Sequence, residues 1–525
     1  MSIFTFLTIL SIVELSLQAS TPSSPTYEAG VVEFNYERDP SITQATRTAL
    51  NLAKYLEIMR EAPSTLDIIV FPEMTLNQME TAVEIPDHRD RVSPCDSVDY
   101  PENNLVKQIS CSAKSHQRYV VVGVVTKVAC PDEEMIANND TRDCADREDS
   151  MSYYNTNVVF DRNGTVISSY RKFNLFGEDV DRPLKPSQVV FESDFGVTFG
   201  HFICFDILFR YPALELTRSQ NITDIIYPTM WFSGFPFLTA VQVQKNWAFS
   251  NNVNLLAAGA NNPSFGSTGT GIFAGRKGSL ISVMEGAKKT SLHTATVPKI
   301  GLGDSIEVTE NVIYRPREEV SQLTLSLEFL DGYNIQFLNT ESQVGETAST
   351  SLCHDGICCT FDYGFYKVNS LPTSHTFAAT VFHGKRIWDG SGYGVTVCAV
   401  VACLTNDTET CAVRMDSMTF DHRWHSLKIS GQFPSGEQYF YLPNTLDSSI
   451  NPFMVREFVY DETFDGTSKV HISMTSVGRI REFYSFGIYG RDFNLDATGG
   501  TKGKQVCYIL MACTIIAACF LEFIK

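Results

Sequence analysis

The sequence has no block of basic residues, and charged side chains of either sign are scarce. Only 19% of its 525 residues are charged, and 60 acidic residues outnumber 41 basic ones, which gives a net charge of −19. Without a basic patch, the chain is not expected to bind nucleic acid. It contains 36 phenylalanines and 21 tyrosines, so the low charge indicates a folded protein and excludes a disordered one. Its length predicts two or three domains.

An apolar run long enough to cross a membrane is missing at the N-terminal end. Residues Ile3 to Val13 are almost wholly apolar, but this run is too short for a membrane helix and Glu14 interrupts it. The run carries no preceding Lys or Arg, and small residues follow it at Ala19 and Ser20. We interpret residues 1–20 as a secretory signal peptide that is cleaved after one of these two residues.

The C-terminal end has an apolar run that is also short for a membrane span. Residues Val506 to Leu521 are nearly all apolar, and they follow a polar spacer and a segment of small residues. This order predicts that residues 496–525 are a signal for a glycosylphosphatidylinositol (GPI) anchor, with Asp496, Gly499 or Gly500 as the attachment site. The protein would then be held at the outer face of the cell membrane by a lipid. A true membrane helix is the alternative.

Paired Cys-x-x-Cys motifs, which mark many zinc sites, are absent although the chain has 14 cysteines. Three cysteines lie in the apolar tail, and Cys204 stands apart from the others. The remaining ten are an even set, as expected for disulfides in a secreted chain. Adjacent cysteines are not expected to pair with each other, and zinc bound near the C-terminal cysteines is the alternative. The ten are Cys95, Cys111, Cys130, Cys144, Cys353, Cys358, Cys359, Cys398, Cys403 and Cys411.

Four Asn-x-Ser/Thr sequons fit the same secretory route. They begin at Asn139, Asn163, Asn221 and Asn406, and each is a candidate glycosylation site. The Asn163-Gly164 pair is also typical of a tight hairpin turn. Both roles are compatible if the turn is exposed.

Three polar residues each follow a strand-like run. Glu73 follows the apolar residues 67–71, Lys172 follows residues 166–169, and Cys204 follows a run that begins at Phe195. Simple alternatives are a surface glutamate, a solvated basic pair and an inert buried cysteine. The residues after Cys204 have helical spacing, which places the thiol near a helix N-terminus, where backbone N–H groups favour a thiolate. We therefore expect Cys204 to project from a tight turn as a nucleophile.

Glu, Lys and Cys in this order, each at a strand end, resemble the triad of the nitrilase superfamily of carbon–nitrogen hydrolases. The resemblance narrows to the vanin and biotinidase branch, from about Tyr27 to Pro298 and more weakly to about residue 490. It implies hydrolysis of a small-molecule secondary amide of pantetheine or biotin, with no metal or organic cofactor. The stretches that carry it are Cys204–Phe209, Ala240–Gln242, Asn246–Ala248, Val253–Ala258 and Gly269–Phe273.

The resemblance also implies a role for each residue. Cys204 attacks the amide carbonyl, and Glu73 moves protons between the thiol, the leaving amine and water. Lys172 stabilises the oxyanion together with backbone N–H groups after Cys204, and Glu178 is expected to hold the Lys172 ammonium. Pantetheine is the preferred substrate. Alternatives are a biotin amide, a nitrile attacked by the same triad, and a surface binding protein that has lost catalysis. The oligomeric state stays open.

Two loops differ from the usual pattern of that branch. Met74 follows Glu73 where the branch has Asp-Gly, and Gly259 and Asn261 stand where it has Asn and His. We expect both loops to line the substrate pocket.

Hydrophobic periodicity divides the chain into two parts. Residues 27–300 alternate between strands and helices, which indicates an α/β domain; the resemblance specifies a four-layer αββα sandwich. Residues 301–495 are mostly strand-like, which predicts a smaller β-rich, cysteine-rich domain. The expected helices are Ile42–Arg60, Leu105–Lys114 and Thr239–Asn251. The expected strands are Val31–Asn35, Asp67–Phe71, Arg118–Val125, Phe195–Phe199, Asp224–Pro228, Val253–Ala258, Leu323–Leu327, Thr376–Phe382, Tyr393–Val401 and Trp424–Ile429, and Pro131–Ser150 is expected to be a loop.

Overall fold

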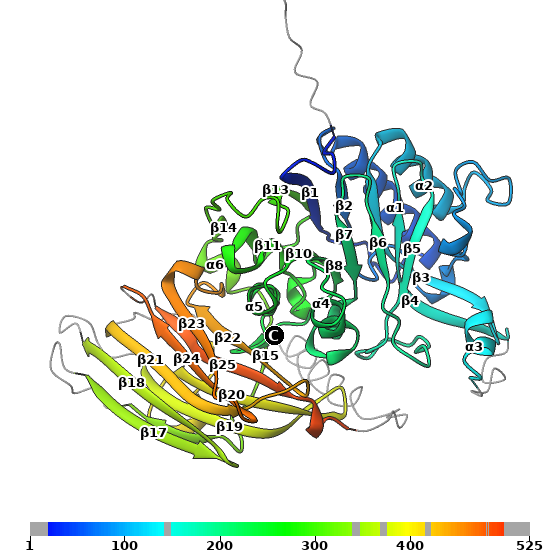
Figure 1. Cartoon of the computed structure of the whole chain (residues 1–525). Helices are drawn as coiled ribbons and strands as arrows, with labels where there is room; N and C mark the ends of the chain where they lie inside the picture. The colour runs from blue at the N-terminus through cyan, green and yellow to red at the C-terminus, as the bar shows by residue number, and fades with distance from the viewer. Residues whose placement is uncertain are drawn as a thin grey trace, which may run out of the picture.

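The computed structural model describes residues 19–140, 149–338, 347–367, 375–414, 422–478, 480 and 482–497. Figure 1 shows an α/β unit, coloured blue to green, beside a unit made of strands, coloured yellow-green to orange. Most of the predicted signal peptide, Cys144 and the apolar tail lie outside the described residues. Within the part of the chain that is described, no helix is both long and apolar enough to cross a membrane.

The α/β unit contains a six-stranded sheet whose first strands are parallel. Strand β1 pairs with β2 and β2 with β3 in parallel, while β3, β4 and β5 form an antiparallel meander. The turn from β4 to β5 contains Asn163, which is exposed, and Gly164, which has a φ of 75°, as the sequence predicts. Along the sheet the order is β13 (Ser291–Pro298), β1 (Thr26–Glu33), β2 (Ile68–Val70), β3 (Tyr119–Ala129), β4 (Met151–Phe160) and β5 (Val166–Arg171).

A second sheet of seven strands lies against the first. Its central strands β7, β8 and β10 are parallel. Strand β6 at one edge is antiparallel to β7, and β11 is antiparallel to both β10 and β12, whereas the edge strand β14 pairs in parallel with β12. Along the sheet the order is β14 (Val312–Ile313), β12 (Ser279–Val283), β11 (Thr270–Ala274), β10 (Asn254–Gly259), β8 (Asp224–Thr229), β7 (Thr198–His201) and β6 (Val190–Glu192).

Three apolar clusters build four layers from these elements. Helices α1 (Gln44–Glu61) and α2 (Leu105–His116) pack on the outer face of the first sheet, and a separate cluster fills the space between the two sheets. Helix α5 (Ala240–Asn251) covers the outer face of the second sheet. The expected αββα sandwich is confirmed, since each sheet buries one face against the other sheet and packs helices on its outer face.

Some local expectations about this unit are wrong. Phe195 and Gly196 form the turn between β6 and β7, and strand β7 begins only at Thr198, because Gly196 adopts a φ of 76° that ends an extended run. The segment expected to be a loop contains a short helix, α3 (Glu133–Ala137). After Cys204 the chain forms a 3₁₀ turn and then one π turn, and α-helix α4 (Glu215–Arg218) begins much later.

The second unit is a sandwich of two five-stranded antiparallel sheets. Aromatic residues from both sheets, such as Phe365 and Phe377, meet in its core. One sheet has the order β16 (Asn334–Phe337), β19 (Thr376–Trp388), β20 (Ser391–Cys403), β25 (Phe483–Asp492) and β22 (Tyr439–Asp447). The other has the order β17 (Ala348–His354), β18 (Ile357–Lys367), β21 (His422–Pro434), β24 (Lys469–Ser476) and β23 (Phe458–Phe464). The prediction of a β-rich domain is confirmed.

Each unit contains disulfide bonds. Cys95 pairs with Cys111 in the α/β unit, and Cys130 is also disulfide-bonded. In the sandwich the pairs are Cys353–Cys358, Cys359–Cys398 and Cys403–Cys411. The adjacent cysteines therefore take different partners, as expected. The zinc alternative is wrong, because all six sandwich cysteines are consumed in disulfides and offer no thiolate.

The two units share a continuous interface along helix α5. The amide of Gln242 donates to Asn444 of β22 at 2.9 Å, and the Lys245 ammonium donates to the Phe453 carbonyl of the sandwich. Short helix α6 (Arg317–Val320) lies in the connection between the units. The strand expected at Leu323–Leu327 is shorter in the structure. It is β15 (Ser326–Leu327), which pairs with β9 (Gly234–Phe235) of the α/β unit. Leu323 itself is buried as a packing residue.

Candidate active site

Glu73 lies in the loop that follows strand β2, with only 2% of its surface exposed. This loop passes close over strand β3, where a Cβ on Gly123 would lie 2.9 Å from the Pro72 carbonyl and 3.0 Å from the Glu73 Cα. Gly123 therefore has no side chain because the loop occupies that space. The packing fixes Glu73 at the end of the strand, pointing into the interior.

Lys172 follows strand β5 directly and reaches the same buried point. Its Nζ lies 2.8 Å from Glu73 Oε1 and also donates to Glu178 Oε1. Lys172 is 2% exposed. The structure thus brings together two of the predicted catalytic residues and the predicted supporting glutamate. The ammonium is held between two carboxylates.

Asn155 of strand β4 joins the two carboxylates from another side. Its Nδ2 donates to Glu73 Oε1 at 2.7 Å and to Glu178 Oε1 at 3.2 Å. Its backbone carbonyl accepts a hydrogen bond from the Lys172 N–H at 2.8 Å. Sequence reasoning missed Asn155, and the available signal was a polar residue inside an otherwise buried strand. The residue fixes the position of Lys172 and of both carboxylates.

Cys204 lies on a tight turn after strand β7. Its φ of 49° falls in the left-handed region, which non-glycine residues rarely adopt. Such strained conformations collect at active sites, where the surrounding structure holds them in place. Here Tyr227 Oη donates to the Cys204 carbonyl at 2.9 Å. The expected tight turn is confirmed.

Asp206, two residues after Cys204, anchors the same turn. It is fully buried and accepts hydrogen bonds from the Ile203 N–H, from Tyr170 Oη and from the backbone and side chain of Asn174. Burial raises its pKa to about 6. Asn174 belongs to the loop that begins at Lys172, so Asp206 ties the Cys204 turn to that loop. A charged residue in the apolar stretch after Cys204 was the signal for this anchor.

The expectation that a helix N-terminus favours the Cys204 thiolate is wrong. The turn from Cys204 to Leu208 is a five-residue 3₁₀ turn and not the start of an α-helix. Burial, together with the negative charge of Glu73, raises the pKa of the Cys204 thiol well above its usual value, and the charge of Lys172 offsets only part of this effect. The resting cysteine is therefore a neutral thiol, 6% exposed.

The charges of the site explain how the proton can leave that thiol. Burial by itself would lower the pKa of Lys172, but the charges of Glu178 and Glu73 outweigh it and keep the ammonium protonated. Burial raises the pKa of Glu73, while Lys172 lowers it. Burial also raises the pKa of Glu178, but the charge of Lys172 and the hydrogen bonds from Lys172 and the Phe176 N–H together outweigh it, and the pKa is lowered. Glu73 is therefore the carboxylate better suited to accept a proton.

The loops that differ from the vanin and biotinidase pattern have structural roles here. A Cβ on Gly259 would lie 2.4 Å from the Gly269 carbonyl, so the two backbones approach too closely for a side chain. Asn261 is fully buried, and its side chain bonds to the Glu33 carboxylate and the Lys289 N–H. Met74, half-buried, has a φ of 49° beside Glu73. That these loops line a substrate pocket stays a prediction.

The remaining candidate residues lie on the surface. Asn139, Asn163, Asn221 and Asn406 are all exposed. In the described part of the chain, no group of three or more His, Cys, Asp and Glu residues is arranged to hold a metal ion. Cys204 is the one free cysteine among the described residues.

Comparisons with known proteins agree with this division of the chain. The family model described as carbon-nitrogen hydrolase matches residues 34–295, and the model described as Vanin C-terminal domain matches residues 323–496. Vanin-like protein 2 of Drosophila melanogaster is 36% identical over 93% of this chain and 93% of its own length. Pantetheinase of Mus musculus is 28% identical over 82% and 80% of the two chains. Biotinidase of Homo sapiens is 29% identical over 72% and 74%.

Proposed function

The chain belongs to the carbon–nitrogen hydrolase family, and we propose that it cleaves the linear amide bond of pantetheine, releasing pantothenate and cysteamine. The observation that carries the proposal is the buried contact of Lys172 with both Glu73 and Glu178 beside the free thiol of Cys204. A base, a fixed cation and a nucleophile are what hydrolysis of an unreactive amide requires.

Acylation begins with the neutral thiol. Glu73 accepts the Cys204 proton as the sulfur attacks the amide carbonyl carbon, so that a separated thiolate never has to persist in this buried site. The carbonyl oxygen becomes an oxyanion, which Lys172 stabilises together with backbone N–H groups after Cys204. The protonated Glu73 then gives its proton to the amine as the C–N bond breaks. The products of this half-reaction are a free amine and a thioester on Cys204.

Deacylation uses the same groups in reverse. Glu73, again a carboxylate, takes a proton from a water molecule that attacks the thioester carbonyl. Lys172 stabilises the second oxyanion. The C–S bond breaks, and the Cys204 sulfur recovers its proton from Glu73. The acid is released and the site returns to its resting state without an external cofactor.

Pantetheine is preferred over a biotin amide because vanin-like relatives match nearly the whole chain. Three vanin-like proteins of Drosophila melanogaster are 32–36% identical over at least 93% of this chain, whereas human biotinidase matches 72% of it. The intact Glu73, Lys172 and Cys204 offer no support for an inactive binding protein.

The test is a comparison of substrates with purified, disulfide-bonded protein. Pantetheine, biotinyl-lysine and a simple nitrile are supplied in parallel, and release of amine or ammonia is measured, with Cys204→Ala as the control. We expect cysteamine release from pantetheine at the highest kcat/KM and none from the variant. Preference for biotinyl-lysine or the nitrile would overturn the choice of substrate, and no release from any of them would overturn the proposed activity.

We also propose that the protein reaches the cell surface and is held there by a lipid. The disulfides and the exposed sequons support a secretory route. Asp496 is tied to the buried Arg491 at 2.6 Å, so Gly499 or Gly500 is the better candidate for the attachment site. Phosphatidylinositol-specific phospholipase should release the protein from intact cells. Retention after this treatment would contradict the GPI anchor.

A further inference from the structure

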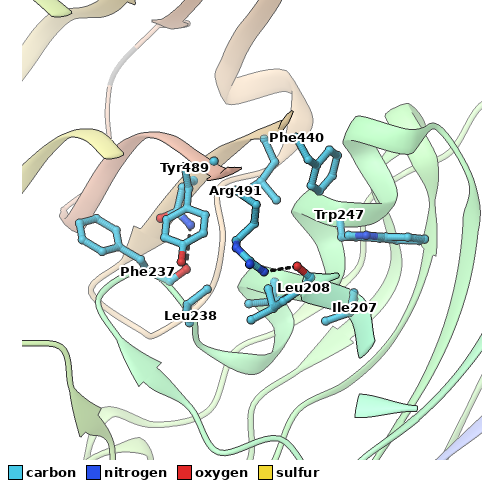
Figure 2. A pocket seen from close by; sticks show the side chains of 12 residues that line it. Ile207, Leu208, Phe237, Leu238, Trp247, Phe440, Tyr489 and Arg491 are labelled. Carbon is cyan, nitrogen blue, oxygen red and sulfur yellow. Dashed lines mark hydrogen bonds between the residues drawn. The ribbon is translucent and has the colours of Figure 1, made fainter. Parts of the chain in front are cut away.

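Arg491 of strand β25 reaches from the β-sandwich into the α/β unit and holds the end of the turn that carries Cys204. Figure 2 shows its guanidinium pointing at the Leu208 carbonyl, to which it donates a hydrogen bond. Leu208 is the last residue of the 3₁₀ turn that begins at Cys204. Arg491 is 2% exposed, and its other nitrogens bond to the Gly394 carbonyl at 2.9 Å and to both oxygens of Asp496. The guanidinium is thus fixed on the sandwich side.

The space around this contact is packed and is not a ligand pocket. Leu208, Phe237, Trp247 and Tyr489 are among the residues that enclose a cavity of about 10 Å³, which has room for no more than one water molecule. The aromatic ring of Phe205, which follows Cys204, also meets Tyr393 of the sandwich at 5.8 Å between centroids. Close packing of this kind transmits the position of one side to the other.

A second contact from the sandwich reaches the loop that carries Glu178. Asp389 lies in the two-residue turn between strands β19 and β20, and its Oδ2 accepts a hydrogen bond from the Gly177 N–H at 3.0 Å. In the same loop, Glu178 bonds through one oxygen to the Phe176 N–H and through the other to Lys172. Asp389 is therefore connected to Lys172 by two hydrogen bonds, one from the Gly177 N–H to Asp389 and one from Lys172 to Glu178, which the backbone between Gly177 and Glu178 joins.

From these two contacts we propose that the β-sandwich is part of the catalytic apparatus, with Arg491 and Asp389 as positioning residues for the Cys204 turn and for Glu178. This inference rests on the proposed function, since it assigns Cys204 and Lys172 their catalytic roles. Both residues act through the backbone of the segments that they hold, at Gly177 and Leu208. Arg491 holds the far end of the nucleophile's turn, and Asp389 holds the loop that keeps Glu178 against the ammonium.

The chain supplies a matched control for Asp389. Asp355 occupies the same position in the two-residue turn between strands β17 and β18: its φ is 43° against 45° for Asp389, and glycine follows in both turns. Asp355 is exposed, and a Cβ added at Gly356 beside it would meet nothing within 4 Å. Glycine is favoured at such positive φ angles. Asp389→Gly and Asp355→Gly therefore keep their hairpins, and only the first removes an acceptor from the active-site loop.

The first readout is pantetheine hydrolysis. We expect Asp389→Gly to lower kcat by about three- to tenfold, the worth of one hydrogen bond, with KM changed less than twofold. Asp389→Asn should restore kcat, because its amide oxygen can accept the same hydrogen bond. Arg491→Lys should lower kcat further. Three different nitrogens of Arg491 donate to Leu208, Gly394 and Asp496, and the single nitrogen of a lysine cannot reach all three positions. Equal kcat values for Asp389→Gly and Asp355→Gly would overturn the role of Asp389.

The second readout needs no substrate and separates the two proposals. Glu73, Glu178 and Lys172 are the charged groups that act on the Cys204 thiol, and the charge of Glu178 raises its pKa. If Glu178 is loosened, the pKa of Cys204 should shift down, so that at one fixed alkaline pH iodoacetamide labels Cys204 faster in Asp389→Gly than in the wild type, and at the wild-type rate in Asp355→Gly. If Asp389→Gly shows this shift but the wild type does not hydrolyse pantetheine, the proposed function alone is rejected. No shift, with an active wild type, would reject the inference alone.

Discussion

Lys172 Nζ lies 2.8 Å from Glu73 Oε1, and neither residue is more than 2% exposed. Glu178 contacts the same ammonium, so one cation faces two carboxylates away from water. Charges are costly in such a place unless they are paired and hydrogen-bonded. The pairing therefore fixes the charge state of the resting site: Lys172 stays protonated, and Cys204 beside it stays a neutral thiol.

Replacing Lys172 with methionine should affect both activity and stability. Loss of the oxyanion-stabilising cation should lower kcat by about 10²-fold to 10³-fold. The two carboxylates would lose their shared counter-charge, which in buried pairs costs about 3–5 kcal/mol. Their pKa values would rise in the folded state. A protein with such a raised carboxyl pKa becomes less stable as the pH increases toward and through that pKa. The variant should thus melt at a higher temperature at pH 5 than at pH 8, as measured by calorimetry.

Lys245→Met is the control for this experiment. Lys245 lies 2.8 Å from Glu310 in an equally buried pair, but Glu310 is not among the residues of the candidate active site. Its removal should cost similar stability and leave kcat nearly unchanged at a temperature where the variant is folded. If Lys245→Met lowered kcat as much as Lys172→Met, the catalytic role of Lys172 would be rejected.

The pH dependence of kcat/KM should show a single acid limb. Glu73 must be ionised to accept the thiol proton, and burial raises its pKa above 4.5, so activity should fall as the pH drops through a value above 4.5. No rise is expected near pH ~8.5, where a free cysteine ionises, because Glu73 removes the proton only during attack. The pKa of Lys172 lies well above 10.5, so no alkaline limb should appear near neutral pH.

Steady-state rates measured from about pH 4 to pH 9 test this profile. Glu73→Gln, which keeps the shape of the side chain, should lose at least ~10²-fold in kcat. An acid limb at or below pH 4.5 would contradict the raised pKa of Glu73, and a rise that follows thiol ionisation would mean that Glu73 is not the base.

The disulfides should differ in their contribution to the stability of the sandwich. Cys359–Cys398 connects strands β18 and β20 across the two sheets with a separation of 39 residues, whereas Cys353–Cys358 spans 5 residues within one hairpin. Loop-closure entropy predicts losses of about 4 and about 2 kcal/mol when each pair is replaced by alanines. Urea unfolding of the two double variants measures the difference. Equal losses, or a larger loss from the hairpin pair, would contradict the entropic account.

The strand-end residues were predictable from sequence because hydrophobic runs mark where buried strands end. Glu73 and Lys172 lie close after strands β2 and β5, as the runs before them indicate, and the helices α1, α2 and α5 begin and end within two residues of the predicted bounds. The direction in which these side chains point is set by neighbouring strands, which local patterns do not show.

Other features depend on contacts that no local pattern reveals. The apolar spacing from Ile207 to Leu216 indicates one helix, yet Pro212 and the extended Tyr211 at φ −110° and ψ 130° break it into short turns. Asn155 contacts Lys172 only because strands β4 and β5 pair in a particular register. Arg491 lies 283 residues after Leu208, and its role emerges only when the two units pack together.

The most direct test of Cys204 as the nucleophile is mass spectrometry of the protein quenched in acid during turnover of pantetheine. We expect a pantothenoyl thioester on the peptide that contains Cys204, formed at the rate of cysteamine release. Cys204→Ala should carry no adduct and release no cysteamine. Turnover of pantetheine without an adduct, together with wild-type turnover by Cys204→Ala, would contradict the account.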